Sequence, residues 1–291
     1  ALDLEKAVYP KEIYETLRQL NYEIDIDSKL AHKQSTEAFL KDLFRIAHIR
    51  HKTYLYLWNK LDWDNFMFII TSSDRLGHFF WNVYEDKKNK NYDKFLQFFH
   101  FIDEIIGELY SRLNENDNFI ILSDHGMELI VQNVYLNTLL EKEAYLELNN
   151  KFKNYNRITN RTKAFVLDPG RVYLNKEGYY PNGSITKEQE NDLIDELKDL
   201  FLSFKYNNKK VIRKVYRKEE IYNGKMLDYA PDLILLENSG FRLRGTIGKK
   251  SLFESDIFSG KHNEEAFLFV NKDIDIKNPK VEDVISLMNS E

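Results

Sequence analysis

The chain has 291 residues, a length typical of one large α/β domain or of two small ones. Its 42 lysines and arginines and 47 aspartates and glutamates give a net charge of −5, which argues against a general nucleic-acid coat because such a protein needs a clearly basic surface. The chain has no cysteine, which excludes disulfide scaffolds, thiolate zinc fingers, iron–sulfur clusters and cysteine nucleophiles, so any metal site must use histidine and carboxylate ligands.

No stretch of the sequence is long and apolar enough for a transmembrane helix, and the N-terminus lacks the apolar core of a signal peptide. We therefore expect no membrane span. A cytoplasmic location follows as the default, and a chain from which a signal had been removed would have the same sequence.

The first 62 residues have a helical pattern. Apolar side chains recur at helical spacing over residues 13–20 and again from Glu37 to about Trp58. Ser35 and Thr36 are candidate caps for the second of these helices. The pattern therefore predicts a helical region over residues 1–62.

A strand–helix–strand pattern follows. Residues 66–71 (FMFIIT) form a short apolar run that predicts a buried strand, residues 92–113 carry one apolar stripe, and residues 119–123 (FIILS) form a second apolar run. This order predicts a right-handed βαβ unit with parallel strands. We assign residues 63–144 to an α/β core.

The third part, residues 145–228, is expected to be a small β/α insertion or cap. Its predicted elements are a strand over 164–174 interrupted by Asp168-Pro169-Gly170, a helix near 193–204 and a strand near 211–216.

Residues 229–291 are expected to return to the core. Their predicted elements are strands at 233–236 and 266–270 and a closing helix at 281–288. The whole pattern predicts an α/β fold with a mostly parallel sheet sandwiched by helices.

Polar residues with metal-binding side chains lie next to three predicted core strands. Asp74 and His78 follow the first strand, Asp124 and His125 follow the second, and His262 precedes the last. Taken alone, Asp74 could be a helix cap, Asp124 and His125 could belong to a polar loop, and His262 could be a surface histidine. Together they supply the nitrogen and oxygen ligands that bind zinc or manganese at the end of a sheet, where ligands of α/β proteins bind.

Three motifs resemble the alkaline phosphatase superfamily, and within it the type I phosphodiesterase / nucleotide pyrophosphatase group. They are SDRLGHFFW at 73–81, SDHGM at 123–127 and SGKH at 259–262. The motifs occur in the order found in the family, and the resemblance covers nearly the whole chain. It implies a fold with a mostly parallel sheet between layers of helices.

The resemblance also implies a site with two divalent cations, zinc or manganese. Asp74, His78 and His262 would bind one ion, and Asp124 and His125 would bind the other. Two such ions hold the attacking and leaving oxygens of a phosphoryl transfer. The implied function is metal-dependent hydrolysis of a small phosphate ester or phosphodiester.

The N-terminal region departs from the family pattern. In the family, a strand that ends in a metal-binding aspartate and a serine or threonine nucleophile precede the region that Asp74 opens, and residues 1–65 contain no such junction. We therefore assign no nucleophile in this chain and expect it upstream. The isolated chain is expected to have little or no turnover, and either to form a homo-oligomer or to depend on a missing N-terminal half.

Other readings stay open at this level. The chain could be a non-catalytic, metal-stabilised binding or regulatory module, a phosphomutase or sulfatase relative, or an α/β domain whose histidines and aspartates are incidental. For Arg75 we favour a structural ion pair over a phosphate contact.

Overall fold

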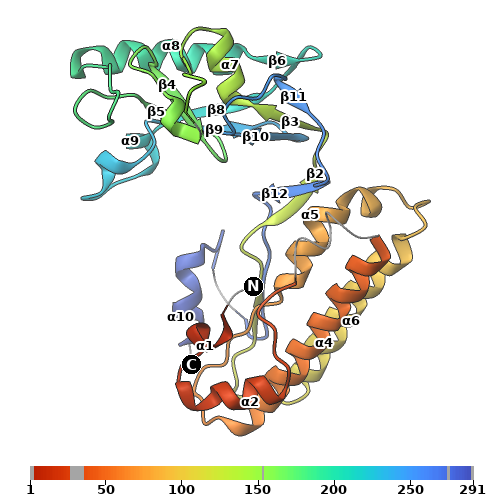
Figure 1. The fold of residues 1–291 in the computed structure, drawn as a ribbon. Coiled ribbons are helices and arrows are strands. Elements are labelled where there is room, and N and C mark those ends of the chain that lie inside the picture. The colour runs from red at the N-terminus through yellow and green to blue at the C-terminus, as the bar shows by residue number, and fades with distance from the viewer. Residues whose placement is uncertain (1–2, 27–35, 153, 274–275, 290–291) are drawn as a thin grey trace. The chain divides into compact units, whose positions relative to one another are not determined.

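The computed structural model describes residues 3–26, 36–152, 154–273 and 276–289 (Figure 1). The described chain combines helices with several small sheets, so the predicted α/β class is confirmed. Its contacts divide it into two compact units, Ala1–Leu129 with Ile257–Glu291 and Ile130–Asp256. In the described part of the chain, no helix has the length and apolar character needed to cross a membrane.

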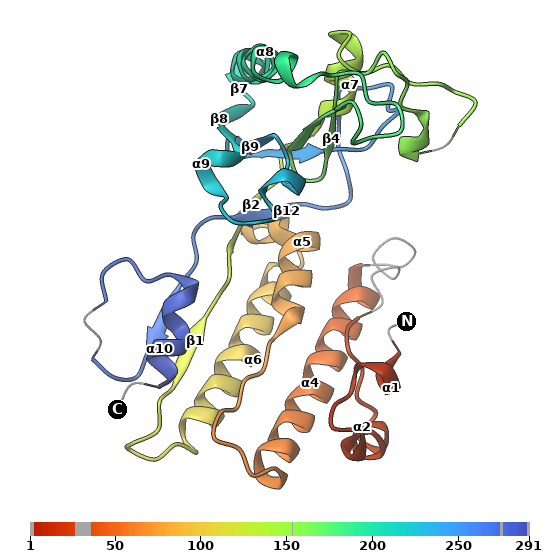
Figure 2. The same cartoon turned by 90° about the vertical axis from the view of Figure 1, so that its left-hand side faces the viewer.

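The first unit is mainly helical. Its helices are α1 (Leu4–Ala7), α2 (Tyr14–Gln19), α4 (Thr36–Lys60), α5 (Thr71–Glu85), α6 (Tyr92–Tyr110) and α10 (Val284–Met288), with 3₁₀ turns η1 (Lys11–Ile13) and η5 (Val281–Asp283). The long helices predicted from apolar periodicity are confirmed as α4 and α6. In Figure 2, α5 lies beside α6, and a shared cluster of buried apolar side chains joins them to α4. Ser35, the predicted cap, lies outside the described residues.

The predicted strand at 66–71 is wrong. Residues 65–70 form no strand, and helix α5 begins at Thr71. Met67 and Ile69 are 80% and 60% exposed, and the carbonyl oxygen of Ile69 accepts hydrogen bonds from Arg50 and Tyr54 of α4. The reason is that a strand needs a neighbouring backbone, and here the backbone is bonded by helix side chains instead.

The strands of the first unit form two antiparallel pairs. Strand β1 (Ile120–Leu122) lies where a strand was predicted, but it pairs antiparallel with β13 (Leu268–Val270). Strand β2 (Gly126–Leu129) pairs antiparallel with β12 (Gly260–Asn263), with His262 opposite Met127. The predicted parallel βαβ unit is therefore not formed.

The second unit is built around two sheets. The first has the order β4-β5-β9-β8 and is antiparallel throughout; the second has the order β10-β3-β11, in which β10 runs parallel to β3. Among the named strands of the described chain this is the single parallel pair, so the expected mostly parallel pairing is not confirmed. The strands are β3 (Gln132–Tyr135), β4 (Ala164–Leu167), β5 (Arg171–Leu174), β6 (Lys205–Tyr206), β7 (Lys209–Lys210), β8 (Ile212–Arg217), β9 (Leu233–Glu237), β10 (Phe241–Arg244) and β11 (Phe253–Glu254).

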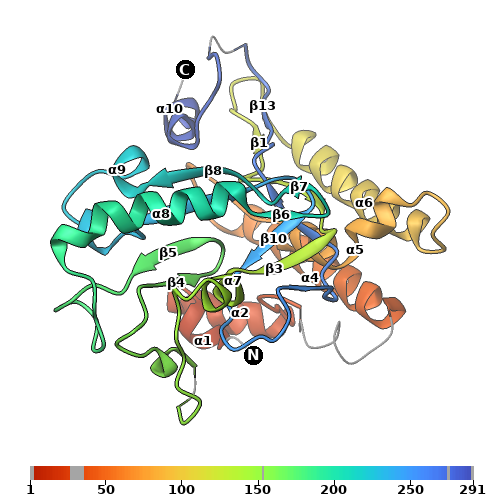
Figure 3. The same cartoon turned by 90° about the horizontal axis from the view of Figure 1, so that it is seen from above.

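Helices cover the core of this second unit. They are α7 (Leu136–Lys142), α8 (Glu190–Ser203) and α9 (Lys218–Ile221), with 3₁₀ turns η2 (Asn154–Arg157), η3 (Lys187–Gln189) and η4 (Leu227–Tyr229). Helix α8 packs against β8 (Figure 3). The interrupted strand predicted at 164–174 is the β4–β5 hairpin, and the helix and strands predicted at 193–204, 211–216 and 233–236 are α8, β8 and β9. The predicted insertion 145–228 lies within this unit, whose bounds are wider.

Candidate metal centre

Helix α5 carries two of the predicted ligands on one face. Asp74 lies in its first turn and His78 one turn further along, the i,i+4 spacing that brings side chains together. His78 Nε2 is 3.4 Å from Asp74 Oδ1. Helical spacing therefore accounts for this half of the site.

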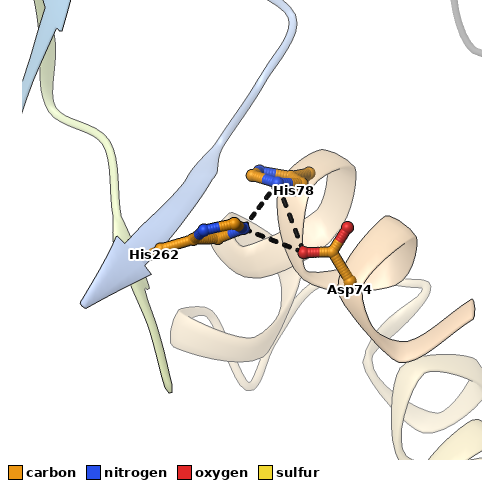
Figure 4. Close-up of side chains that lie close together, drawn as sticks. All are labelled: Asp74, His78 and His262. Atoms are coloured by element: carbon orange, nitrogen blue, oxygen red, sulfur yellow. Dashed lines mark hydrogen bonds and ion pairs between the residues drawn. The ribbon is translucent and has the colours of Figure 1, made fainter. Parts of the chain in front are cut away.

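The β2–β12 ribbon brings the third ligand from the other end of the chain. His262 Nε2 lies 2.9 Å from Asp74 Oδ1 and 3.0 Å from His78 Nε2 (Figure 4). One ligand atom from each of the three residues lies within 4.8 Å of the other two. The three side chains predicted to share one ion thus converge, although 184 positions separate His78 from His262.

Backbone carbonyls set the tautomers of two rings. Nδ1 of His78 lies 2.9 Å from the carbonyl oxygen of Gly260, and Nδ1 of His125 lies 3.0 Å from that of Gly126. A carbonyl can only accept, so each Nδ1 carries the proton and a neutral ring presents the lone pair of Nε2. This carbonyl contact is the usual support of a metal-binding histidine.

Three imidazole nitrogens crowd around one carboxylate oxygen of the cluster. Asp74 Oδ1 is approached by Nε2 of His78, of His262 and, at 3.9 Å, of His125. Burial lowers the pKa of His262, and the charges of the two neighbouring histidines act in the same direction, while the hydrogen bond to Asp74 opposes them. A carboxylate only accepts, so His262 Nε2 donates this hydrogen bond. Imidazole nitrogens beside a carboxylate are a donor set that fits zinc or manganese once that proton is lost.

Asp124 and His125 lie beside this cluster. The ring of His125 stacks on that of His262 with centroids 3.4 Å apart, and its Nε2 is 3.5 Å from Asp124 Oδ1. The Asp124 side chain is 83% exposed. The structure therefore brings all five predicted ligands into one region.

Glycines allow the helix and the ribbon to touch, a feature that the sequence reasoning missed. A Cβ atom on Gly260 would overlap the carbonyl oxygen of Gly77, and one on Gly77 would lie 2.7 Å from Cε of Met127. The sequence signal for this close contact was a glycine one residue before His78 and another two residues before His262. Gly126 begins β2, and a Cβ atom there would overlap Asn263 and Glu265.

Arg75 holds the other oxygen of the central carboxylate. Its guanidinium lies 3.1 Å from Asp74 Oδ2 and 2.7 Å from Asp25 Oδ2, and the hydrogen bond to Asp25 is the main cause that raises the pKa of Arg75. The favoured structural ion pair is thus present. It leaves Asp74 Oδ1 turned toward the histidines.

Comparison with known proteins gives a family and two similar structures. The family model described as type I phosphodiesterase / nucleotide pyrophosphatase matches residues 5–265. Phosphonoacetate hydrolase from Sinorhizobium meliloti 1021, in complex with phosphonoformate, is similar at 15% identity and a TM-score of 0.39, over 65% of this chain and 43% of that chain. Murine ectonucleotide pyrophosphatase / phosphodiesterase 5 is similar at 17% identity and a TM-score of 0.34, over 68% of this chain and 43% of that chain. The chain thus spans less than half the length of either, and no curated protein matches it.

Proposed function

Because the chain belongs to the type I phosphodiesterase / nucleotide pyrophosphatase family, we propose that it carries the metal-binding part of a phosphoric ester hydrolase. The observation that supports this most directly is the convergence of His78 Nε2, His262 Nε2 and Asp74 Oδ1. These residues come from two of the three motifs that resemble the family, at 73–81 and 259–262. The proposed substrate is a small phosphate ester or phosphodiester.

The proposed ligands of one zinc or manganese ion are Asp74, His78 and His262. A divalent ion there would supply Lewis acidity toward a phosphoryl oxygen and lower the pKa of a bound hydroxyl or water. The chain's own contribution is orientation: Gly260 holds the His78 ring through Nδ1, and Arg75 holds Asp74 through Oδ2. The His262 side chain is 48% exposed, so a phosphate group has access to the cluster from solvent.

Asp124 and His125 are proposed as part of a second cation site. The stacking of His125 on His262 supports this, because an ion bound by His125 would lie near the first. Two ligands are fewer than the three or four that a zinc site needs, so this second site requires donors from elsewhere. Because no nucleophile is assigned in this chain, we also propose that the isolated chain binds metal with little or no turnover.

Metal analysis tests this proposal. We expect the parent protein, purified without chelators and incubated with zinc or manganese, to retain at least one ion per chain after gel filtration. His262→Ala should lose it, because two remaining ligands cannot hold the ion. His100→Ala, which removes an exposed histidine of α6, is the matched control and should keep it.

Two results would contradict the proposal. One is a parent protein that binds neither metal and whose thermal unfolding is unchanged by them. The other is a His262→Ala protein with the metal content of the parent. If metal binds as expected but a longer protein containing this chain does not hydrolyse a chromogenic phosphodiester, the non-catalytic module is the better description.

A further inference from the structure

Helix α5 is bent in the turn that follows His78. Phe80 has φ −131° and ψ 19°, which are not helical values, although helix lies on both sides of it. The helix contains no proline that could cause this bend. A helix also bends where another group enters its ladder of backbone hydrogen bonds. The cause of the bend is therefore to be sought in what contacts the backbone beside Phe80.

Ser259, which directly precedes β12, contacts the backbone on both sides of the bend. A regular α-helix joins the amide of Asn82 to the carbonyl oxygen of His78, four positions earlier. Here the backbone amide of Ser259 donates to that carbonyl oxygen at 2.8 Å, and the amide of Asn82 donates to Oγ of Ser259 at 3.3 Å. Ser259 thus bridges the donor and the acceptor of one helical step.

The same short segment also holds the ring of His78. The carbonyl oxygen of Gly260 accepts from Nδ1 of that ring at 2.9 Å. Three hydrogen bonds therefore join residues 259–260 to residues 78–82, and two of them involve His78. His262 follows two positions after Gly260, and its Nε2 lies 3.0 Å from Nε2 of His78 (Figure 4). The contact at the bend is thus also the contact that brings the two imidazoles together.

We propose that Ser259 is a positioning residue of the metal centre, an inference that rests on the proposed function of that centre. Its hydroxyl oxygen accepts from the amide of Asn82, which keeps the turn after His78 open for the backbone of Ser259. The carbonyl group and the ring of His78 are thereby fixed against β12, and so is the separation of its Nε2 from that of His262. Ser259 acts through His78, because groups that orient a ligand ring raise its affinity for the metal.

Zinc affinity tests this role. Ser259→Ala removes the acceptor of the Asn82 amide, and we expect it to weaken zinc binding ~10-fold or more, as the loss of a group that orients a metal ligand does. Competition with a chromogenic chelator measures the affinity. Ser259→Thr keeps the hydroxyl group, so it should bind zinc more tightly than Ser259→Ala.

Ser111→Ala is the matched control. Oγ of Ser111 donates to the carbonyl oxygen of Glu108 in α6 at 2.7 Å, so this substitution also removes a bond between a serine and a helix of the first unit. It should leave zinc affinity unchanged. Each of the two alanine variants loses one hydrogen bond, so the unfolding temperature of the metal-free protein should fall by at most ~4 °C in both.

The tautomer of His78 gives a second measurement, made without metal. Two-bond proton–nitrogen NMR correlations of histidine-labelled protein show which ring nitrogen carries the proton, and a His78→Gln protein assigns the signal by its loss. We expect the proton on Nδ1 in the parent, because Gly260 accepts from it, and a mixture of tautomers in Ser259→Ala.

The proposal is wrong if Ser259→Ala binds zinc as tightly as the parent or Ser111→Ala, or if the proton of His78 stays on Nδ1 in Ser259→Ala as in the parent. A parent protein that binds no zinc overturns the proposed function instead. The tautomer change, which needs no metal, then still supports the placement of His78 by Ser259.

Discussion

One carboxylate oxygen of Asp74 lies at the centre of the histidine cluster. Asp74 Oδ1 is the common neighbour of the three imidazoles, while its second oxygen is held by Arg75. A substitution that removes the negative charge of Asp74 but keeps the shape of its side chain therefore tests the centre of the cluster more sharply than the removal of a whole side chain.

We expect Asp74→Asn to weaken zinc binding by ~100-fold or more, because a neutral amide is a far poorer ligand than a carboxylate. Competition with a chromogenic chelator measures the affinity. Asp93→Asn, at an exposed carboxylate of α6, serves as the control and should bind zinc as the parent does. Equal affinities for the parent and Asp74→Asn would exclude Asp74 as a ligand.

The histidines also predict how stability and metal binding depend on pH. The folded-state pKa of His262 is lowered by burial, so between that pKa and the unfolded value of about 6.5 the unfolded chain binds more protons. The free energy of unfolding of the metal-free protein should therefore rise with pH in this window and level off above it. Metal affinity should fall in acid as well, because bound imidazoles must be neutral.

Urea unfolding at a series of pH values, with and without zinc, checks this prediction. His262→Ala should show a flatter rise in the metal-free series. A free energy of unfolding for the parent that falls as pH rises through this range would contradict the assignment.

At the scale of elements, the site depends on how closely α5 approaches the β2–β12 ribbon. Gly77 and Gly260 face each other at the contact, and neither position has room for a Cβ atom without a shift of its neighbours. The distance between the helix ligands and His262 therefore depends on these two positions being glycine.

We expect Gly260→Ala to destabilise the protein by ~1–3 kcal/mol and to weaken metal binding, because the added methyl group overlaps the backbone of α5. Gly107 of α6 is the matched control, since a Cβ there meets nothing within 4 Å. Gly107→Ala should instead stabilise the protein by ~0.5–1 kcal/mol through helix propensity. Chemical denaturation and zinc titration of both variants measure the effects, and a Gly260→Ala protein with parental values would contradict the argument.

At the scale of the whole molecule, the first unit leaves apolar side chains in solvent. Met67 and Ile69 of the unpaired segment are 80% and 60% exposed, and Phe267 and Phe269 near β13 are also exposed. Apolar surface of this kind promotes association. The homo-oligomer expected from the sequence remains a prediction.

We expect the protein to self-associate with increasing concentration, and the double variant Met67→Ser, Ile69→Ser to do so less. Sedimentation equilibrium measures the change in mass. Val281→Ser, at an exposed apolar residue of the same unit, is the control for general surface polarity. A parent protein that stays monomeric at high concentration would show that this surface has no partner in a second copy.

The sequence by itself determined the long helices, the strand region at 164–174 with its interruption at Asp168-Pro169-Gly170, the five candidate ligands and the family. Helices such as α4 and α6 follow from local spacing, because a helix forms its hydrogen bonds within its own segment. The spacing of Asp74 and His78 is also local, so the sequence alone identified both as candidate metal ligands.

Only the tertiary structure decided which backbones pair and which ligands meet. The apolar run at 66–71 had the composition of a strand, yet no strand formed because its backbone had no neighbouring strand and Arg50 and Tyr54 bonded it instead. The approach of His262 to Asp74 depends on contact between two distant glycines. Strand pairing and site closure arise from segments far apart in sequence, and such contacts leave no periodic signal in either segment alone.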